Sequence, residues 1–194
     1  GRNAGDNAIL GNLLDDFALE RNDILFQVPT LNPGFIRTHF GGHRVRPMGM
    51  LPWNLALKNL GWPLFRAMTD TELILVTDNI LFDRKFNNPF VNNLKSIALF
   101  SSFSRKKNIP IVLYNASVGP IDHEVGRQAL QKVLDSCPLV ITRDEQTREL
   151  IETLRHPEIV VHADCALNTQ IPSEARLQEI ARKEDLFRGP NGTI

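Results

Sequence analysis

The segment IVLYNASVGPI, residues 111–121, is the stretch that decides the fold of this chain. It begins as a short apolar run rich in Val and Ile, which is typical of a strand covered on both faces of a sheet. Gly119 and Pro120 then stop the run, so the strand is predicted to cover 111–116 and to leave Ser117 at its carboxyl end. A buried strand that ends in such a polar turn is typical of the parallel sheets of α/β proteins.

Four further runs of this kind are predicted as strands, at 23–28, 73–77, 139–142 and 159–163. Between them, apolar residues recur at the three- and four-residue spacing of helices, at 7–19, 125–134, 150–154 and after Pro172, where Ser173 is the expected N-cap. Strands that alternate with helices predict an α/β fold, a Rossmann-like parallel sheet with helices on both faces, in one domain. The segment 34–52, rich in Gly, Pro, His and Arg, is predicted as a loop.

The composition excludes some classes of function. The chain has 194 residues, 42% of them hydrophobic and 23% charged, which suits an ordinary protein with a well-buried core. Its 22 Lys and Arg balance 22 Asp and Glu, so it lacks the basic face that nucleic acids need, and no nucleic-acid partner is expected. The basic run Arg105-Lys106-Lys107 is interpreted as the end of a helix, where cations complement the helix dipole.

Cys137 and Cys165 are far apart and lie beside apolar runs, which suits buried thiols in a reducing compartment. The sequence shows no signal peptide and no apolar run long enough to span a bilayer. We therefore predict a cytoplasmic protein without a transmembrane segment. No cofactor and no metal site are predicted, because the His residues lack a ligand spacing and no Cys-x-x-Cys, P-loop or G-x-S-x-G motif is present. His123, at a helix start, is interpreted as solvated.

The opening residues Asn3, Gly5, Asp6 and Asn7 form a turn that leads into a helix. Free N–H groups at a helix start can hold an anion or a sugar hydroxyl, and Gly5 allows a ligand to approach the backbone closely. Asp6 has two interpretations: it caps the helix, or it accepts hydrogen bonds from sugar hydroxyls and acts as a general base. The spacing alone favours the cap.

Polar residues also follow the later strands. The candidate substrate-binding residues there are Asp78, Asn79, Ser117, Gly119, Arg143 and Asp164. Each also has a turn or capping explanation; Asp144, for example, can cap the next helix while Arg143 pairs locally. Because the carboxyl ends of parallel strands meet at one edge of a sheet, we predict that Asp6, Ser117 and Asp164 converge there on a shared site.

Four short motifs occur in order: Asn3-x-Gly5-Asp6-x-Ala8-Ile9, Ala116-Ser117-x-Gly119-Pro120-Ile121, Thr142-Arg143-Asp144-Glu145 and Ala163-Asp164. In these motifs the sequence resembles the polysaccharide pyruvyl transferases. The resemblance implies a lobe like the N-terminal one of a GT-B-type two-lobed transferase, covering residues 1–188 without its first strand, and a linker at 189–194 into a C-terminal lobe. It also implies transfer of a pyruvate ketal from phosphoenolpyruvate, a donor substrate, to a sugar of a cell-surface polysaccharide or its lipid-linked precursor.

The sequence departs from the family where Thr77-Asp78-Asn79 replaces the usual consecutive glycines. The resemblance implies that the Arg and His residues for phosphoenolpyruvate belong to the C-terminal lobe, which leaves the sugar or glycan acceptor to this one. The reaction also needs an acid to protonate the enol carbon, and the sequence identifies none. Two alternatives stay open: a GT-B glycosyltransferase that uses a nucleotide sugar, and an inactive glycan-binding protein, which the replaced glycines favour.

Overall fold

The computed structural model describes residues 4–49, 62–77, 80–88, 92–154 and 158–183. Along the chain the elements are α1 (Ala4–Glu20), β1 (Phe26–Thr30), α2 (Pro33–His39), β2 (Val45–Gly49), α4 (Trp62–Thr69), β3 (Ile74–Thr77), β4 (Ile80–Leu81), α5 (Leu94–Lys107), β5 (Ile111–Val118), α6 (Glu124–Leu134), β6 (Leu139–Thr142), α7 (Glu145–Glu152), β7 (Ile159–Val161), the 3-10 helix η1 (Cys165–Asn168) and α8 (Glu174–Lys183).

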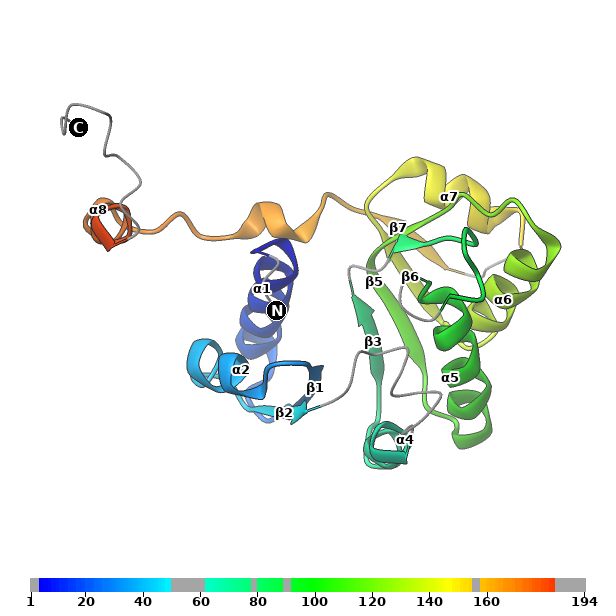
Figure 1. Cartoon of the computed structure of the whole chain (residues 1–194), viewed down its shortest axis with the longest axis horizontal. Coiled ribbons are helices and arrows are strands. Elements are labelled where there is room, and N and C mark those ends of the chain that lie inside the picture. Colours follow the sequence, from blue (N-terminus) through cyan, green and yellow to red (C-terminus); the bar gives the residue numbers. More distant parts are fainter. Residues whose placement is uncertain (1–3, 50–61, 78–79, 89–91, 155–157, 184–194) are drawn as a thin grey trace.

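The main sheet is parallel, with strand order β3-β5-β6-β7 (Figure 1). The fifth strand, β4, also pairs with β5: β3 lies beside the start of β5, where Ile74 faces Ile111, and β4 lies beside its end, where Ile80 faces Ser117. The strands predicted near 73–77, 111–116, 139–142 and 159–163 are confirmed, with end points that differ by no more than two residues. The α/β class and the parallel pairing are therefore as predicted.

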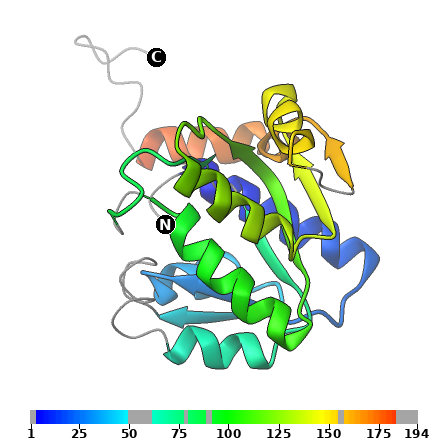
Figure 2. The same cartoon turned by 90° about the vertical axis from the view of Figure 1, so that its right-hand side faces the viewer.

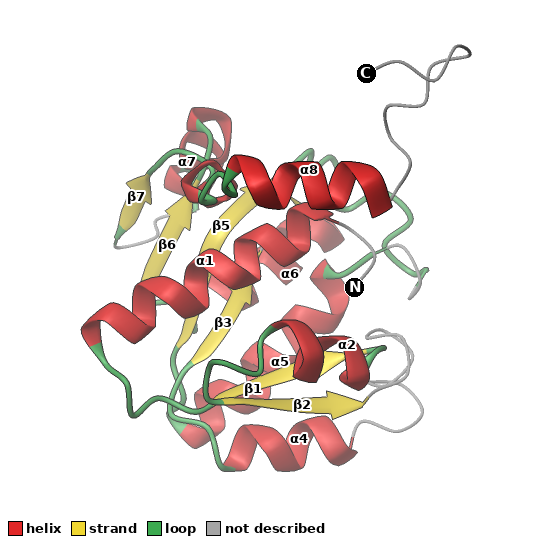
Figure 3. Ribbon diagram, turned by 90° about the vertical axis from the view of Figure 1, so that its left-hand side faces the viewer, coloured by secondary structure: helices red, strands yellow, loops and turns green. Residues whose placement is uncertain are grey.

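Helices cover both faces of this sheet. Figure 2 shows α5 and α6 on one face, and Figure 3, from the opposite side, shows α1 across the other. The core lies under α5 and α6, where Leu113 of β5 is fully buried with Ile97, Leu130 and Val133 from the two helices. Arg105, Lys106 and Lys107 form the last turn of α5, as the sequence predicted. Among the described residues, no helix is both long and apolar enough to cross a membrane.

The strand predicted at 23–28 does not join the main sheet. It runs from 26 to 30 as β1 and pairs in parallel with β2 alone, as a separate two-stranded sheet. Leu14 of α1 packs there against Ile36 and Phe40, which gives this small sheet its own cluster. The prediction of one sheet for all the strands was therefore wrong.

The prediction of a loop at 34–52 was also wrong, because α2 and β2 fall within it. The start of α2 carries recognisable signals: Asn32 is the N-cap, its side chain accepts a hydrogen bond from the Phe35 N–H, and Pro33 follows at the first helical position. Strand β2 contains Pro47, a residue that argues against a central strand but is tolerated in a two-stranded ribbon, where each strand has a free edge.

Candidate functional site

The candidate site is the edge of the main sheet at the carboxyl ends of its strands. Ser117 lies near the end of β5, Arg143 follows β6, and Asp164 lies in the segment after β7. Helix α1 runs against the strand direction, so its amino end, with Gly5, Asp6 and Asn7, lies toward the same edge (Figures 1 and 3). The structure thus brings Ser117 and Asp164 together at one edge, with the first turn of α1 on that side. Asn3, Asp78 and Asn79 lie outside the described residues.

Ser117 is held by the start of α7. Its Oγ donates a hydrogen bond to Oδ2 of Asp144 at 2.8 Å, while Oδ1 of Asp144 accepts from the N–H of Thr147 at 2.7 Å. Asp144 is the N-cap of α7, as the sequence indicated. The hydroxyl of Thr147 in turn accepts from the N–H of Val118 at 2.8 Å. Two of these hydrogen bonds, from Ser117 to Asp144 and from Val118 to Thr147, therefore join the end of β5 to the start of α7.

Asp164 collects a second set of contacts. Its Oδ2 lies 2.8 Å from Nη1 of Arg143, and its Oδ1 accepts from Nδ2 of Asn115 at 3.2 Å and from the N–H of Ala166 at 3.0 Å. The last bond makes Asp164 the N-cap of η1. The side chains of Arg143 and Asp164 are 24% and 34% exposed, so a ligand at this edge can reach both.

Asn115 is a site residue that the sequence analysis missed. It is 3% exposed and has a φ of 55°, in the left-handed region, at an irregularity in the pairing of β5 with β6. Asn tolerates this conformation better than most residues, and such a bulge redirects side chains near functional sites. Its Oδ1 accepts from the N–H of Cys165 at 3.2 Å, and its Nδ2 contacts Asp164. An Asn within an otherwise apolar strand was the signal that could have identified it.

The two carboxylates stay charged over most of the pH range. Burial alone would raise the pKa of Asp144, but hydrogen bonds from Thr147 and Ser117 and the charge of Arg143 outweigh it, so the pKa lies below its ordinary value. Burial likewise opposes ionisation of Asp164, and bonds from Ala166, Asn115 and Arg143 bring the pKa of Asp164 below its usual range. Two anionic acceptors therefore lie at this edge near neutral pH.

The structure also places Asp6 and Gly119, two further residues that the sequence analysis singled out. Asp6 is an exposed residue in the first turn of α1, two positions after the helix begins at Ala4, so it does not occupy the capping position that the spacing favoured. An acidic residue in a first turn still interacts favourably with the helix dipole. Gly119 has a φ of 118°, which favours glycine, and its N–H donates to the carbonyl of Leu81 at 2.7 Å.

Asp83 and His123 form a second polar pair that the sequence analysis did not predict. Asp83 follows β4 and is 2% exposed; its Oδ2 accepts from the backbone N–H of His123 at 2.5 Å and lies 3.0 Å from Nδ1 of the same residue. His123 is the N-cap residue of α6. Its ring is 67% exposed, in agreement with the expected solvated position, but the contact with Asp83 is additional.

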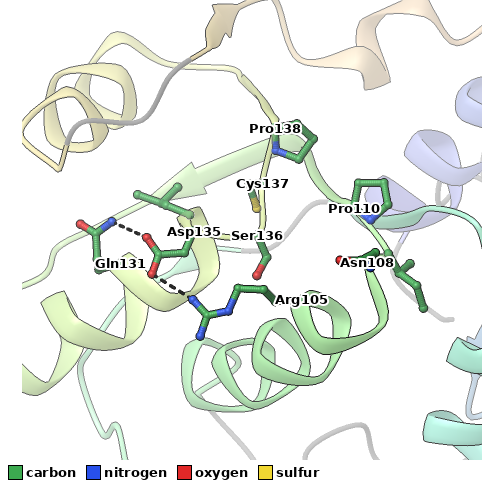
Figure 4. Close-up of a pocket in the computed structure, with 10 residues that line it drawn as sticks. Arg105, Asn108, Pro110, Gln131, Asp135, Ser136, Cys137 and Pro138 are labelled. Atoms are coloured by element: carbon green, nitrogen blue, oxygen red, sulfur yellow. Dashed lines mark hydrogen bonds and ion pairs between the residues drawn. The ribbon is translucent and has the colours of Figure 1, made fainter.

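A surface pocket lies at the opposite edge of the sheet, where β5 and β6 begin (Figure 4). Arg105 and Asp135 form an ion pair of 3.5 Å across it, and Gln131 donates to Asp135 at 2.9 Å. Cys137 lines the pocket but is buried, and burial raises the pKa of its thiol to about 12, so it is a poor nucleophile. Arg105, Asp135 and Gln131 thus pair with each other, which suits a structural role.

The edge site offers carboxylates, an amide and a hydroxyl, which are groups that hydrogen-bond sugar hydroxyls. Within the described ranges, no group of three or more His, Cys, Asp or Glu side chains is arranged to hold a metal ion. The residues that sequence reasoning missed here are Asn115 within β5, Asp83 after β4 and Thr147 in the first turn of α7.

Comparison with known proteins gives one result. The family model described as polysaccharide pyruvyl transferase matches residues 3–192. No curated protein and no solved structure matches the chain significantly. The family match spans nearly the whole chain and includes every motif in which the sequence resembles this family. The chain therefore belongs to the polysaccharide pyruvyl transferase family.

Proposed function

We propose that this protein takes part in the transfer of a pyruvate ketal from phosphoenolpyruvate to two hydroxyls of a sugar, within a cell-surface polysaccharide or its precursor. Membership of the family supports the transferase class. The observation that supports the acceptor role is the arrangement of Asp144, Asp164 and Ser117 at one edge of the sheet, where partly exposed polar groups are held by hydrogen bonds.

The charge of this edge favours a sugar over the donor. Asp144 and Asp164 are both anionic, and the positive charge of Arg143 is balanced by Asp164 at 2.8 Å. Phosphoenolpyruvate carries a phosphate and a carboxylate, which these carboxylates repel. Neutral hydroxyls, in contrast, donate hydrogen bonds to carboxylates. We propose that this parallel sheet is the acceptor lobe of a two-lobed transferase and that cationic residues of a second lobe hold the donor.

The proposed reaction adds two hydroxyls to one carbon. The methylene carbon of phosphoenolpyruvate gains a proton and becomes the methyl group of the ketal, and the neighbouring carbon forms a bond to each sugar oxygen. Inorganic phosphate leaves with the electron pair of the broken C–O bond. Of the two hydroxyl protons, one is accounted for by the new methyl group and the other by the released phosphate.

The test is turnover by the full-length natural protein. It is incubated with phosphoenolpyruvate and candidate glycans, and the products are followed by phosphate release and by the NMR signal of the ketal methyl group. Phosphate release that depends on the glycan, together with a new methyl signal, is expected. A parallel incubation with nucleotide sugars is the control.

The outcome separates the proposal from the alternatives. Turnover with a nucleotide sugar but not with phosphoenolpyruvate would identify a glycosyltransferase and contradict the proposal. Glycan binding without turnover of either donor would instead identify a glycan-binding protein. The sequence feature that favours this last alternative is Thr77-Asp78-Asn79, which stands where the family usually has glycines.

A further inference from the structure

The carboxylate of Asp83 is buried, although one of its two oxygens has no hydrogen-bond partner among the described residues. Its side chain is fully buried, Oδ2 makes both contacts with His123, and Oδ1 has no hydrogen-bond partner among the described residues. Leaving a buried polar atom unpaired costs about 1–3 kcal/mol, and more for a charged group. A buried atom of this kind calls for an explanation, and a role in catalysis is one of the few that apply.

Helix α6 packs so closely on the carboxylate of Asp83 that one helix position accepts only glycine unless its neighbours move. A Cβ added to Gly126 of α6 would collide with the Cβ of Asp83 and would lie 2.7 Å from its Oδ2. The N–H of Asp83 also donates to the carbonyl of Pro120 at 3.3 Å, which ties the segment after β4 to the turn after β5. Asp83 is thus fixed from both sides, and it holds His123 in turn.

The orientation of the histidine ring follows from these contacts. Nδ1 lies 3.0 Å from the carboxylate, so it carries a proton and donates to Asp83. Nε2 lies on the other side of the ring. Because the His123 side chain is 67% exposed, Nε2 can exchange a proton with a bound ligand or with water. A buried carboxylate that orients a histidine in this way is the arrangement found in acid–base catalysis.

The position of the ring matches that use. His123 lies just after the turn that ends β5, and Asp83 lies just after β4, which pairs with β5 at Ser117 and Val118. The pair therefore lies at the same edge of the sheet as Ser117. Ligands of open parallel sheets bind at this edge.

We propose that His123 is the acid–base residue of the pyruvyl transfer and that Asp83 is its positioning residue. This inference rests on the proposed function. Protonated Nε2 of His123 donates its proton to the methylene carbon of phosphoenolpyruvate, and the electrons of the double bond form the new C–H bond. A sugar hydroxyl bonds to the neighbouring carbon and returns its proton to Nε2. The first addition therefore leaves His123 as it began, and no further reactant is needed.

A capping role alone does not account for the pair. The His123 side chain makes no capping hydrogen bond, and the backbone N–H that donates to Asp83 is supplied by any residue other than proline. The ring adds a second contact to the same oxygen while remaining mostly exposed, so it contributes little to the core. Substitution of His123 thus removes the ring but keeps the backbone hydrogen bond to Asp83, which makes the proposal testable without unfolding the helix.

The experiment compares kcat and KM of the full-length protein with those of two variants. His123→Gln is expected to lower kcat about 100-fold or more, with KM for the glycan and the thermal midpoint unchanged, because general acid–base groups contribute this much. His123→Gly, which keeps a good N-cap residue, is expected to regain part of its kcat when imidazole is added. His39→Gln is the matched control, since His39 is an exposed histidine of α2, and it is expected to retain full activity.

The possible failures are distinguishable. If the wild-type protein turns over and His123→Gln has the same kcat, the acid–base role is overturned and the proposed function is retained. A lowered kcat that imidazole does not restore in His123→Gly, together with a lowered thermal midpoint, would assign the ring to structure and also overturn the role. The absence of any pyruvyl transfer by the wild-type protein would overturn the proposed function and this inference with it.

Discussion

Nη1 of Arg143 lies 2.8 Å from Oδ2 of Asp164, and the contact joins the segment after β6 to the segment after β7. Both side chains remain partly exposed, so the pair faces any ligand at the edge of the sheet. An incoming anion meets a cation whose charge is already balanced, whereas a sugar hydroxyl meets a carboxylate oriented by three donors. We therefore expect the pair to discriminate between the two substrates of the proposed reaction.

The first prediction concerns this discrimination. Calorimetric titration of the 194-residue chain with phosphoenolpyruvate is expected to show no saturable micromolar binding. The same chain is expected to bind acceptor sugars weakly and to show no turnover. Asp164→Asn removes the competing negative charge, so phosphoenolpyruvate binding should become measurable in that variant. Micromolar binding to the unaltered chain, abolished by Arg143→Ala, would instead place the donor in this lobe.

The second prediction concerns the cap of α7. Asp144→Ala removes the bonds to Thr147 and Ser117, and it is expected to lower the free energy of unfolding by about 1–2 kcal/mol, as for other N-cap losses. Urea unfolding measures the change. Glu145→Ala is the matched control, because Glu145 is the next residue and forms an ion pair with the partly exposed Arg148. Its effect should stay below about 0.5 kcal/mol. Equal losses in the two variants would argue against the cap.

The third prediction separates two roles of Asn115. Asn115→Gly loses the side-chain bonds to Asp164 and Cys165 but accepts the φ of 55°, and it is expected to cost about 2 kcal/mol in the free energy of unfolding. Asn115→Ala loses the same bonds and should cost about 1 kcal/mol more, because alanine is strained in the left-handed region. Chemical denaturation of both variants measures the difference. If alanine proved no worse than glycine, the backbone conformation would impose no constraint.

The fourth prediction is a dependence of stability on pH. The pKa values of Asp144 and Asp164 are lowered in the folded protein, so the unfolded chain binds protons first as the pH falls. Their stabilising contribution is complete above the unfolded value of about 4 and is lost as the pH falls through the lower folded values. Thermal midpoints measured between pH 7 and pH 3 should show the loss. Asp144→Asn and Asp164→Asn should each weaken this dependence, and unchanged dependence in both would contradict the assignment.

Much of the main sheet was predictable because its strands are short, apolar and bounded by turns. The run at 139–142 became β6 with the predicted end points, and Asp144 and Ser173 cap α7 and α8 as their positions indicated. These features depend on local residue chemistry, which the sequence contains in full. The convergence of Ser117 and Asp164 also followed, because parallel strands share their carboxyl edge.

The features that failed depend on contacts between distant residues. Nothing in the run at 23–28 reveals that its partner is β2, and Pro47 concealed β2 itself. The pairing of Asp83 with His123 joins positions 40 residues apart, and that of Asn115 with Asp164 joins positions 49 apart. Local patterns identify candidates for such contacts, but the fold alone decides which candidates meet.

The hydrogen bonds of Asn12 connect the two ends of the described chain. From the middle of α1, Nδ2 of Asn12 donates to the carbonyl of Cys165 at 2.6 Å and to the hydroxyl of Thr169 at 3.2 Å, across 153 and 157 positions. Contacts between residues so far apart in sequence form late in folding, because a large loop must close before they stabilise anything. Helix α1 precedes η1 in the chain, so these two bonds can form only after the strands of the main sheet that lie between them in sequence have been synthesised.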